Sequence, residues 1–156
     1  VFLFPLIPRG PWSGITAIEN FKYPIFSHIL KRLNAIPIDR KNKALAIQSI
    51  NIAESVLNNN IHIGILPEGS RTVTGKMSPL KKGGFHMAKN TNTSIIPVGI
   101  CGAYSYKPKN RWWLKPGKIS INIGKAIKPI QYNNINDLLN ATRLQLKKLS
   151  QEHNES

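Results

Sequence analysis

Four residues capable of ligand chemistry stand together directly after one apolar run of the sequence. The run at residues 61–66 is followed, after a proline, by Glu68, Gly69, Ser70 and Arg71. An arginine guanidinium is a planar fork of donors that matches a phosphate, and glycine lets the backbone approach a ligand closely. A serine hydroxyl adds a weaker donor, and a glutamate can accept from a substrate hydroxyl. Together the four residues predict a site for a phosphorylated ligand.

This segment has two other interpretations. A phosphate-cradling P-loop has four residues between its first glycine and a Gly-Lys pair, which Ser or Thr follows. Here five residues separate Gly69 from the Gly-Lys pair at 75–76, and a methionine follows, so nucleotide hydrolysis is set aside. The second alternative is a polar loop in which Glu68 and Arg71 pair only with each other. Spacing alone leaves that alternative open.

A second arginine follows another short apolar run. Residues 36–38 are Ile-Pro-Ile, and Asp39 and Arg40 come directly after them. Ligands in α/β sheets bind just beyond the carboxyl ends of strands. If these two strand ends are adjacent, Arg40 and Arg71 lie around one anion. A third apolar run, at residues 95–98, supplies a further wall.

The elements that position these residues follow from apolar periodicity. The run at 61–66 is nearly continuously apolar, which is typical of a central strand buried on both faces. The last helix is expected to begin at a cap provided by Asn136 or Asp137. Alternating strands and helices predict an α/β sheet with helices packed on it, in a single domain over residues 1–156. Strands are expected at 15–18, 36–38, 61–66, 95–100 and 119–123, and helices at 24–33, 43–58, 84–89 and 136–149.

Composition narrows the class of protein. Hydrophobic residues make up 41% of the chain, too many for a disordered protein. With 22 Lys and Arg against 7 Asp and Glu, the net charge is +15, which attracts nucleic acid, an anionic membrane or small phosphates. AT-rich coding accounts for about half of this excess in our interpretation. Cys101 is the only cysteine, which excludes a disulfide framework and predicts a buried, inert thiol.

Three motifs, in this order, resemble the glycerolipid acyltransferase family. Its members share runs like Gly-x-Ile-Pro-Ile-Asp-Arg, Phe-Pro-Glu-Gly-Thr-Arg-Ser and Val-x-Pro-Val, which residues 34–40, 66–72 and 95–98 match. Each motif is weak alone, but three at plausible spacing are specific. Residues 80–85 are also similar to the family's Phe-Lys-x-Gly run. The resemblance covers roughly residues 15–129 and implies a mixed, largely parallel sheet flanked by helices.

The resemblance implies an activity and roles for the site residues. The reaction is transfer of a fatty acyl group from acyl-CoA or acyl carrier protein to 1-acylglycerol-3-phosphate (lysophosphatidic acid), giving phosphatidic acid. By this analogy Arg40 and Arg71 bind the substrate phosphate, and Glu68, Gly69 and Ser70 complete the acceptor pocket. The acyl donor is a substrate, and neither a metal nor a cofactor is expected.

The chain departs from the family pattern in two places. Asn34 stands where the family has glycine, and because asparagine tolerates left-handed backbone the turn is expected to survive. The family's general base is the histidine of Asn-His-x-x-x-x-Asp, and no histidine here has an aspartate five positions on. We expect that motif upstream of Val1, so the chain is interpreted as an N-terminally incomplete fragment, inactive by itself. His62 is expected in a core strand and His86 on a helix surface.

Two segments are candidates for a lipid interface. The stripe of the helix at 25–33 favours packing on the sheet over membrane contact. The loop at 104–113 mixes aromatics with cations, which suits a lipid interface or single-stranded nucleic acid. From the resemblance we expect lysophospholipid and acyl thioester substrates, a membrane surface at its cytoplasmic face, and no nucleic acid. The alternatives are a non-catalytic lysophospholipid-binding relative and, less favoured, a basic nucleic-acid-binding module.

Overall fold

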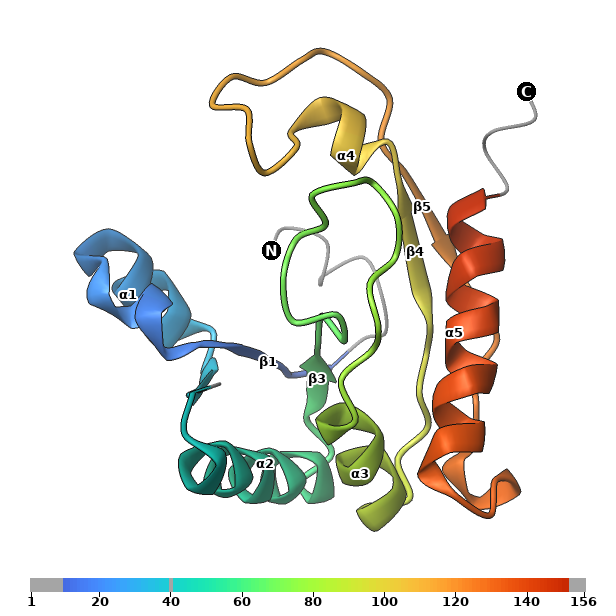
Figure 1. Ribbon diagram of the computed structural model, residues 1–156. Coiled ribbons are helices and arrows are strands. Elements are labelled where there is room, and N and C mark those ends of the chain that lie inside the picture. Colours follow the sequence, from blue (N-terminus) through green and yellow to red (C-terminus); the bar gives the residue numbers. More distant parts are fainter. Residues whose placement is uncertain (1–9, 40, 152–156) are drawn as a thin grey trace. The chain divides into compact units, whose positions relative to one another are not determined.

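The structure is a computed structural model that describes residues 10–39 and 41–151 (Figure 1). The chain divides into two compact units, residues 1–66 and residues 67–156, each with its own sheet. The α/β fold predicted from the alternating elements is confirmed. The assignment of residues 1–156 to a single domain stays a prediction. Among the described helices, none combines the length and the apolarity that crossing a bilayer requires.

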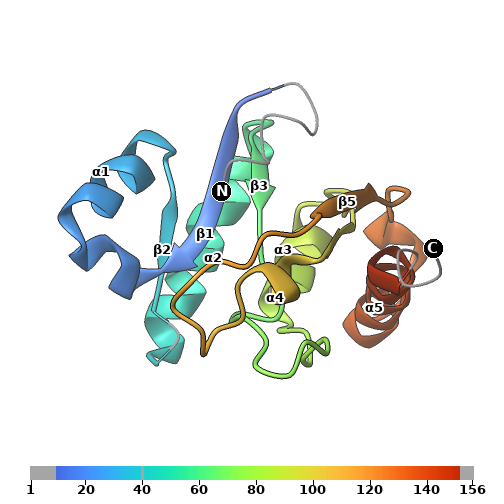
Figure 2. The same ribbon diagram turned by 90° about the horizontal axis from the view of Figure 1, so that it is seen from above.

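The first unit is a parallel sheet with helices packed against it. The strands have the order β2-β1-β3, with Ile15 opposite Ile36 and Trp12 opposite His62. Figure 2 shows β1 between its two neighbours, with α2 running behind the strands. In chain order the elements are β1 Trp12–Ala17, the 3-10 helix η2 Ile18–Lys22, α1 Pro24–Arg32, β2 Ile36–Ile38, α2 Lys43–Asn58 and β3 His62–Gly64.

Asparagines form the turns on both sides of β2. Asn34, before the strand, has a φ of 49°, so the left-handed turn expected where the family has glycine is present. The hydroxyl of Ser13 donates to the Asn34 carbonyl at 2.7 Å. After the strand, the side-chain oxygen of Asn42 accepts from the N–H groups of Ala44 and Leu45 and caps α2. The two turns set the ends of the strand that precedes Arg40.

The second unit is a two-stranded antiparallel sheet with a long helix alongside. Gly99 of β4 pairs with Asn122 of β5, and the Asn122 amide donates to the Leu149 carbonyl of α5 at 2.7 Å. A Cβ at Gly99 would lie 2.6 Å from the Leu149 Cβ, so this strand can approach the helix only with glycine there. The elements are α3 Gly83–Asn90, β4 Val98–Cys101, α4 Ala103–Tyr106, β5 Ser120–Ile123, the 3-10 helix η3 Pro129–Gln131 and α5 Ile135–Gln151.

The core of the second unit lies between α3 and α5. Leu80, Phe85, Ile127 and Leu138 are buried together there, and Leu138 has no exposed surface. Leu80 lies near the end of the loop at residues 67–82, which carries most of the predicted site. The core therefore anchors one end of that loop.

Four details differ from the sequence-based expectations. The strand expected at 95–100 begins only at Val98 and ends at Cys101. The run at 61–66 is not a central strand in the described sheet, because β3 ends at Gly64 and pairs only with β1, while Leu66 is 75% exposed. The cap of α5 is Asn134, whose side-chain oxygen accepts the Asp137 N–H at 2.9 Å, rather than Asn136 or Asp137. The basic, aromatic segment expected as a loop begins with the short helix α4.

Candidate functional site

The loop at residues 67–82 has a closed stem. The Lys81 N–H donates to the Pro67 carbonyl at 2.7 Å, and the Ser78 N–H donates to the carboxylate of Glu68, also at 2.7 Å. Both bonds join the start of the loop to its end. Glu68, which is half-buried, therefore holds the loop closed. Sequence analysis did not identify Ser78, because a bond from a carboxylate to a backbone N–H ten residues away has no sequence signal.

The guanidinium of Arg71 has no bonding partner in the part of the chain that the structure describes. Its side chain is exposed, and no hydrogen bond or ion pair joins it to any residue that the structure describes. The alternative in which Glu68 and Arg71 pair only with each other is therefore wrong for the described part of the chain. Ser70 is exposed beside it. An unpaired guanidinium next to a hydroxyl can take a phosphate in a bidentate, charge-assisted contact.

The sequence around Arg71 strengthens its attraction for anions. Between Glu68 and Asp137 the chain has no acidic residue at all. An anion bound at Arg71 therefore meets no competing carboxylate from this segment, and the long-range potential there is positive. The cations of this acid-free segment are Arg71, Lys76, Lys81, Lys82, Lys89, Lys107, Lys109, Arg111, Lys115, Lys118, Lys125 and Lys128.

The tip of the loop is fastened to α4. The hydroxyl of Tyr104 donates to the Val73 carbonyl at 2.8 Å, and its ring lies where a Cβ at Gly75 would be only 3.1 Å away. Within the tip, the Thr72 hydroxyl donates to the Lys76 carbonyl at 2.8 Å. Hydrogen bonds thus fix both the stem of the loop, at Glu68, and its tip, at Val73, and Arg71 lies between them in the sequence. Tyr104 is a supporting residue that sequence analysis missed, because its partner is 31 positions away.

Gly69 adopts a conformation that other residues rarely accept. Its φ is +74°, in the left-handed region, while a Cβ there would make only ordinary contact, 3.6 Å from the Lys81 side chain. Backbone strain, rather than a clash, is therefore the cost of a side chain at this position. Gly69→Ala is expected to destabilise the loop by about 1–2 kcal/mol. Urea denaturation will measure the loss, with Gly14→Ala, at a glycine outside the left-handed region, as the comparison. Equal losses for the two variants would contradict this account.

Arg40 lies outside the described residues. Its neighbour Asp39 accepts the N–H groups of Lys41 and Asn42 at 2.9 and 3.3 Å, which forms the turn into α2. That Arg40 and Arg71 bind one anion together stays a prediction.

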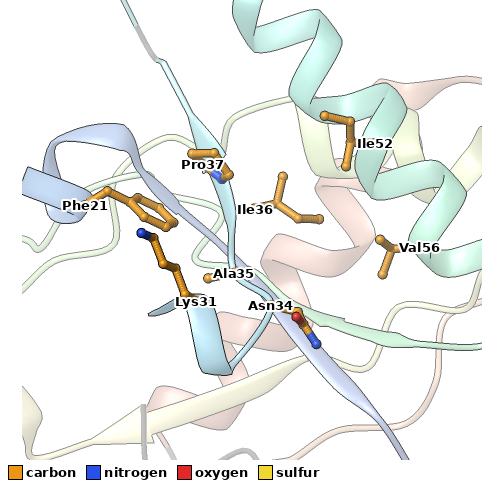
Figure 3. Close-up of a pocket in the computed structure, with 8 residues that line it drawn as sticks. All are labelled: Phe21, Lys31, Asn34, Ala35, Ile36, Pro37, Ile52 and Val56. Carbon is orange, nitrogen blue, oxygen red and sulfur yellow. The ribbon is translucent and has the colours of Figure 1, made fainter. Parts of the chain in front are cut away.

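The first unit has a shallow pocket between α1, β2 and α2 (Figure 3). It encloses about 370 Å³, and Figure 3 shows the Lys31 amino group close to the Phe21 ring at one side. Apolar walls with one cation suit an amphiphile that has an apolar body and an anionic end. Four of its residues come from the first motif. The lining consists of Phe21, Lys31, Asn34, Ala35, Ile36, Pro37, Ile52 and Val56.

The histidines and the cysteine that the sequence offers as candidates for chemistry lie outside the loop at residues 67–82. His86 is exposed on α3, as expected. His62 lies in a strand as expected, with its ring centroid 5.0 Å from that of Trp12, but it is only half-buried and β3 is an edge strand of the described sheet, so its expected place in the core is wrong. Cys101 is only half-buried, and its thiol lies 3.4 Å from the carbonyls of Leu149 and Ser150. The prediction of a buried thiol is therefore confirmed only in part.

Comparison with known proteins gives consistent matches. A family model described as Acyltransferase matches residues 3–101. A 1-acyl-sn-glycerol-3-phosphate acyltransferase from Cocos nucifera is 36% identical over 124 residues, covering 79% of this chain and 40% of that protein. The enzyme of the same name from Pseudomonas aeruginosa is 31% identical over 118 residues, covering 75% and 46%. The chain thus spans less than half the length of these two relatives.

A solved structure also matches. The crystal structure of the 1-acyl-sn-glycerophosphate (LPA) acyltransferase PlsC from Thermotoga maritima superposes with a TM-score of 0.76 at 26% sequence identity. The match covers 89% of this chain and 55% of that one. The fold and the sequence motifs therefore both match proteins described as acyltransferases.

Proposed function

The chain belongs to the acyltransferase family, and from this premise we propose that the protein transfers a fatty acyl group to 1-acylglycerol-3-phosphate. The observation that carries the proposal is Arg71, whose exposed guanidinium has no partner among the residues that the structure describes, on a loop closed by Glu68. The names of the matched relatives support the choice of acceptor. The product is phosphatidic acid.

The transfer replaces the thioester bond of the donor with an ester bond on the acceptor. The free hydroxyl oxygen of the acceptor attacks the thioester carbonyl carbon, an oxygen–carbon bond forms, and the carbon–sulfur bond breaks to release the thiol. A general base takes the hydroxyl proton. The base stays the prediction drawn from the resemblance, the histidine of Asn-His-x-x-x-x-Asp. We propose acyl-CoA or acyl carrier protein as the donor, with no metal and no cofactor.

The residues of this chain hold the acceptor. Arg71 binds the phosphate, which places the attacking hydroxyl, and Arg40 assists it. Each charge-assisted hydrogen bond contributes ~1.5–3 kcal/mol. Gly69 and Ser70 line the same turn, and Glu68 keeps it closed. Because acceptor and product are membrane lipids, we propose that the protein works at a membrane surface, on its cytoplasmic face.

The test compares two acceptors that differ only in the phosphate. In the full-length natural protein, with labelled acyl-CoA or acylated acyl carrier protein as donor, 1-acylglycerol-3-phosphate should yield phosphatidic acid with a kcat/KM at least ~10-fold above that for acylation of 1-acylglycerol, because only the first engages Arg71. Equal rates would contradict phosphate recognition. Binding of the phosphorylated acceptor without turnover by the full-length natural protein would favour the non-catalytic relative. Absence of both binding and turnover would overturn the proposal.

A further inference from the structure

The segment between α4 and β5 exposes large apolar side chains. Three consecutive residues of this Trp loop, residues 107–119, are Trp112, Trp113 and Leu114, with 86%, 53% and 56% of their surface exposed. Tryptophan is among the side chains that gain most from burial, with about 150–250 Å² to remove from water. Adjacent exposed side chains of this size mark an interaction surface.

The exposure of Trp112 follows from a defined loop structure. The Arg111 guanidinium donates to the carbonyls of Ser105 and Tyr106 at 2.8 and 2.6 Å, and to that of Trp113 at 3.1 Å. It also lies 5.7 Å from the centroid of the Trp113 ring, in a cation–π contact. Arg111 therefore binds backbone carbonyls on both sides of Trp112, and the Trp112 ring stays exposed to solvent.

The end of the loop returns to Gly102, the residue directly before α4. The φ of Gly102 is +81°, and a Cβ there would lie 2.1 Å from the Lys118 carbonyl, so only glycine permits this approach. Near the start of the loop, the Lys115 N–H donates to the Tyr106 carbonyl at 3.0 Å. Backbone contacts thus close the base of the Trp loop, and the bonds of Arg111 fix its interior.

The charge of the loop selects the kind of partner. Lys109, Lys115 and Lys118 are exposed, and the loop lies within the acid-free segment between Glu68 and Asp137. Each cation near an anionic bilayer contributes attraction, and tryptophan prefers the interface between headgroups and acyl chains. An anionic lipid surface satisfies both the cations and the exposed apolar side chains.

Single-stranded nucleic acid fits this arrangement less well. Platforms that stack bases need open aromatic faces. Here the Trp113 ring is in contact with Arg111, and the two indoles meet edge to face, with centroids 5.7 Å apart and planes at 79°. Leu114 beside them is aliphatic and cannot stack, whereas it gains from entering an acyl layer.

We propose that the Trp loop docks on an anionic bilayer, with Trp112 and Leu114 entering the interface and the three lysines meeting lipid headgroups. Tyr104 connects this docking element to the candidate phosphate loop, because its hydroxyl binds the Val73 carbonyl. The loop that carries Arg71 is thereby tethered to the element that meets the membrane. The proposed function explains why the protein would need a membrane, and in this respect alone the docking proposal rests on it.

The fluorescence of Trp112 tests the docking directly. With Trp12→Phe and Trp113→Phe, the remaining tryptophan is Trp112. Vesicles of phosphatidylcholine and phosphatidylglycerol should shift its emission to the blue, brominated lipids should quench it, and salt should weaken both effects. Vesicles of phosphatidylcholine alone should do much less. Unchanged emission with anionic vesicles would overturn the proposal. Quenching by oligothymidylate without any vesicle effect would overturn it in favour of nucleic acid.

Matched variants separate the loop from general surface effects. Trp112→Ala should weaken partitioning to anionic vesicles by about tenfold or more, because the largest inserted side chain is lost. Ile130→Ala, at a residue 75% exposed in the same unit but outside the loop, should leave it unchanged. Lys109→Glu should weaken binding, and Lys128→Glu, an exposed cation elsewhere in that unit, should weaken it less. Equal effects within either pair would contradict docking through the Trp loop.

Failure of this proposal can be told apart from failure of the proposed function. Vesicle binding is measured without acceptor or donor, so intact docking without acyl transfer would refute only the acyltransferase activity. Acyl transfer to acceptor dispersed in detergent, with no response of Trp112 to vesicles, would refute only the docking.

Discussion

In the full-length natural protein, replacing Arg71 with alanine is expected to lower kcat/KM for acylation of 1-acylglycerol-3-phosphate by about 10- to 150-fold. This range is the loss of one charge-assisted contact of ~1.5–3 kcal/mol, converted to a rate ratio. If the contact is equally strong in the ground and transition states, the loss will appear as a higher KM for the acceptor with kcat unchanged. Steady-state kinetics with the acceptor varied at saturating donor will separate the two.

Three controls make this expectation specific. Lys125→Ala removes an exposed cation from the same unit, outside the candidate loop, and should change kcat/KM little. Arg71→Lys should give an intermediate value, because an ammonium retains the charge but not the bidentate fork. With 1-acylglycerol as acceptor, Arg71→Ala and the natural protein should be alike. Equal losses for Arg71→Ala and Lys125→Ala would show that net charge, and not the guanidinium, matters.

Elements with complete local signals were predictable from the sequence. Helix α2 occupies Lys43–Asn58, as its apolar spacing predicts, and Asn42 caps it through two backbone N–H groups. Strand β2 covers the run at 36–38, and the proline within it agrees with the place of this strand at the edge of the described sheet. In these elements propensity, capping and burial all favour the same structure.

Interactions between distant segments could not be predicted in this way. The apolar run at 61–66 looks the same whether a strand is central or at an edge, since the difference lies in which other strands pair with it. Arg111 donates to three backbone carbonyls, and Tyr104 donates to the Val73 carbonyl. Every residue offers such an acceptor, so the sequence does not show which one is used. Such contacts depend on tertiary structure, and residue types do not reveal them.

For the candidate site, the sequence proposes the members but does not show how they interact. Residue type and motif identified Glu68, Gly69, Ser70 and Arg71. The structure adds that Glu68 closes the loop through Ser78, so one predicted acceptor residue has a supporting role. Conversely, Glu68 accepts from Ser78, and Arg71 has no bond to any described residue, which excludes the ion pair that spacing alone left open for the part of the chain described.

The largest expected effect on stability comes from Leu138→Ala. Leu138 has no exposed surface and packs with Leu80, Phe85 and Ile127 in the core of the second unit. Removing its side chain leaves a cavity, which should lower the free energy of unfolding by ~2–5 kcal/mol. Leu144→Ala, on the same helix α5 but 69% exposed, should change it by less than ~1 kcal/mol. Chemical denaturation of both variants will measure the difference.

This core also connects stability to the site, because Leu80 lies near the end of the loop that carries Arg71. A cavity beside Leu80 should loosen the end of the stem where Lys81 bonds to Pro67. Amide hydrogen exchange at Lys81 should therefore accelerate in Leu138→Ala under conditions where the variant is still folded, and should stay unchanged in Leu144→Ala. If Leu138→Ala lowers global stability but leaves exchange at Lys81 equal to that of the natural protein, the loop is held by its own hydrogen bonds and does not depend on the core.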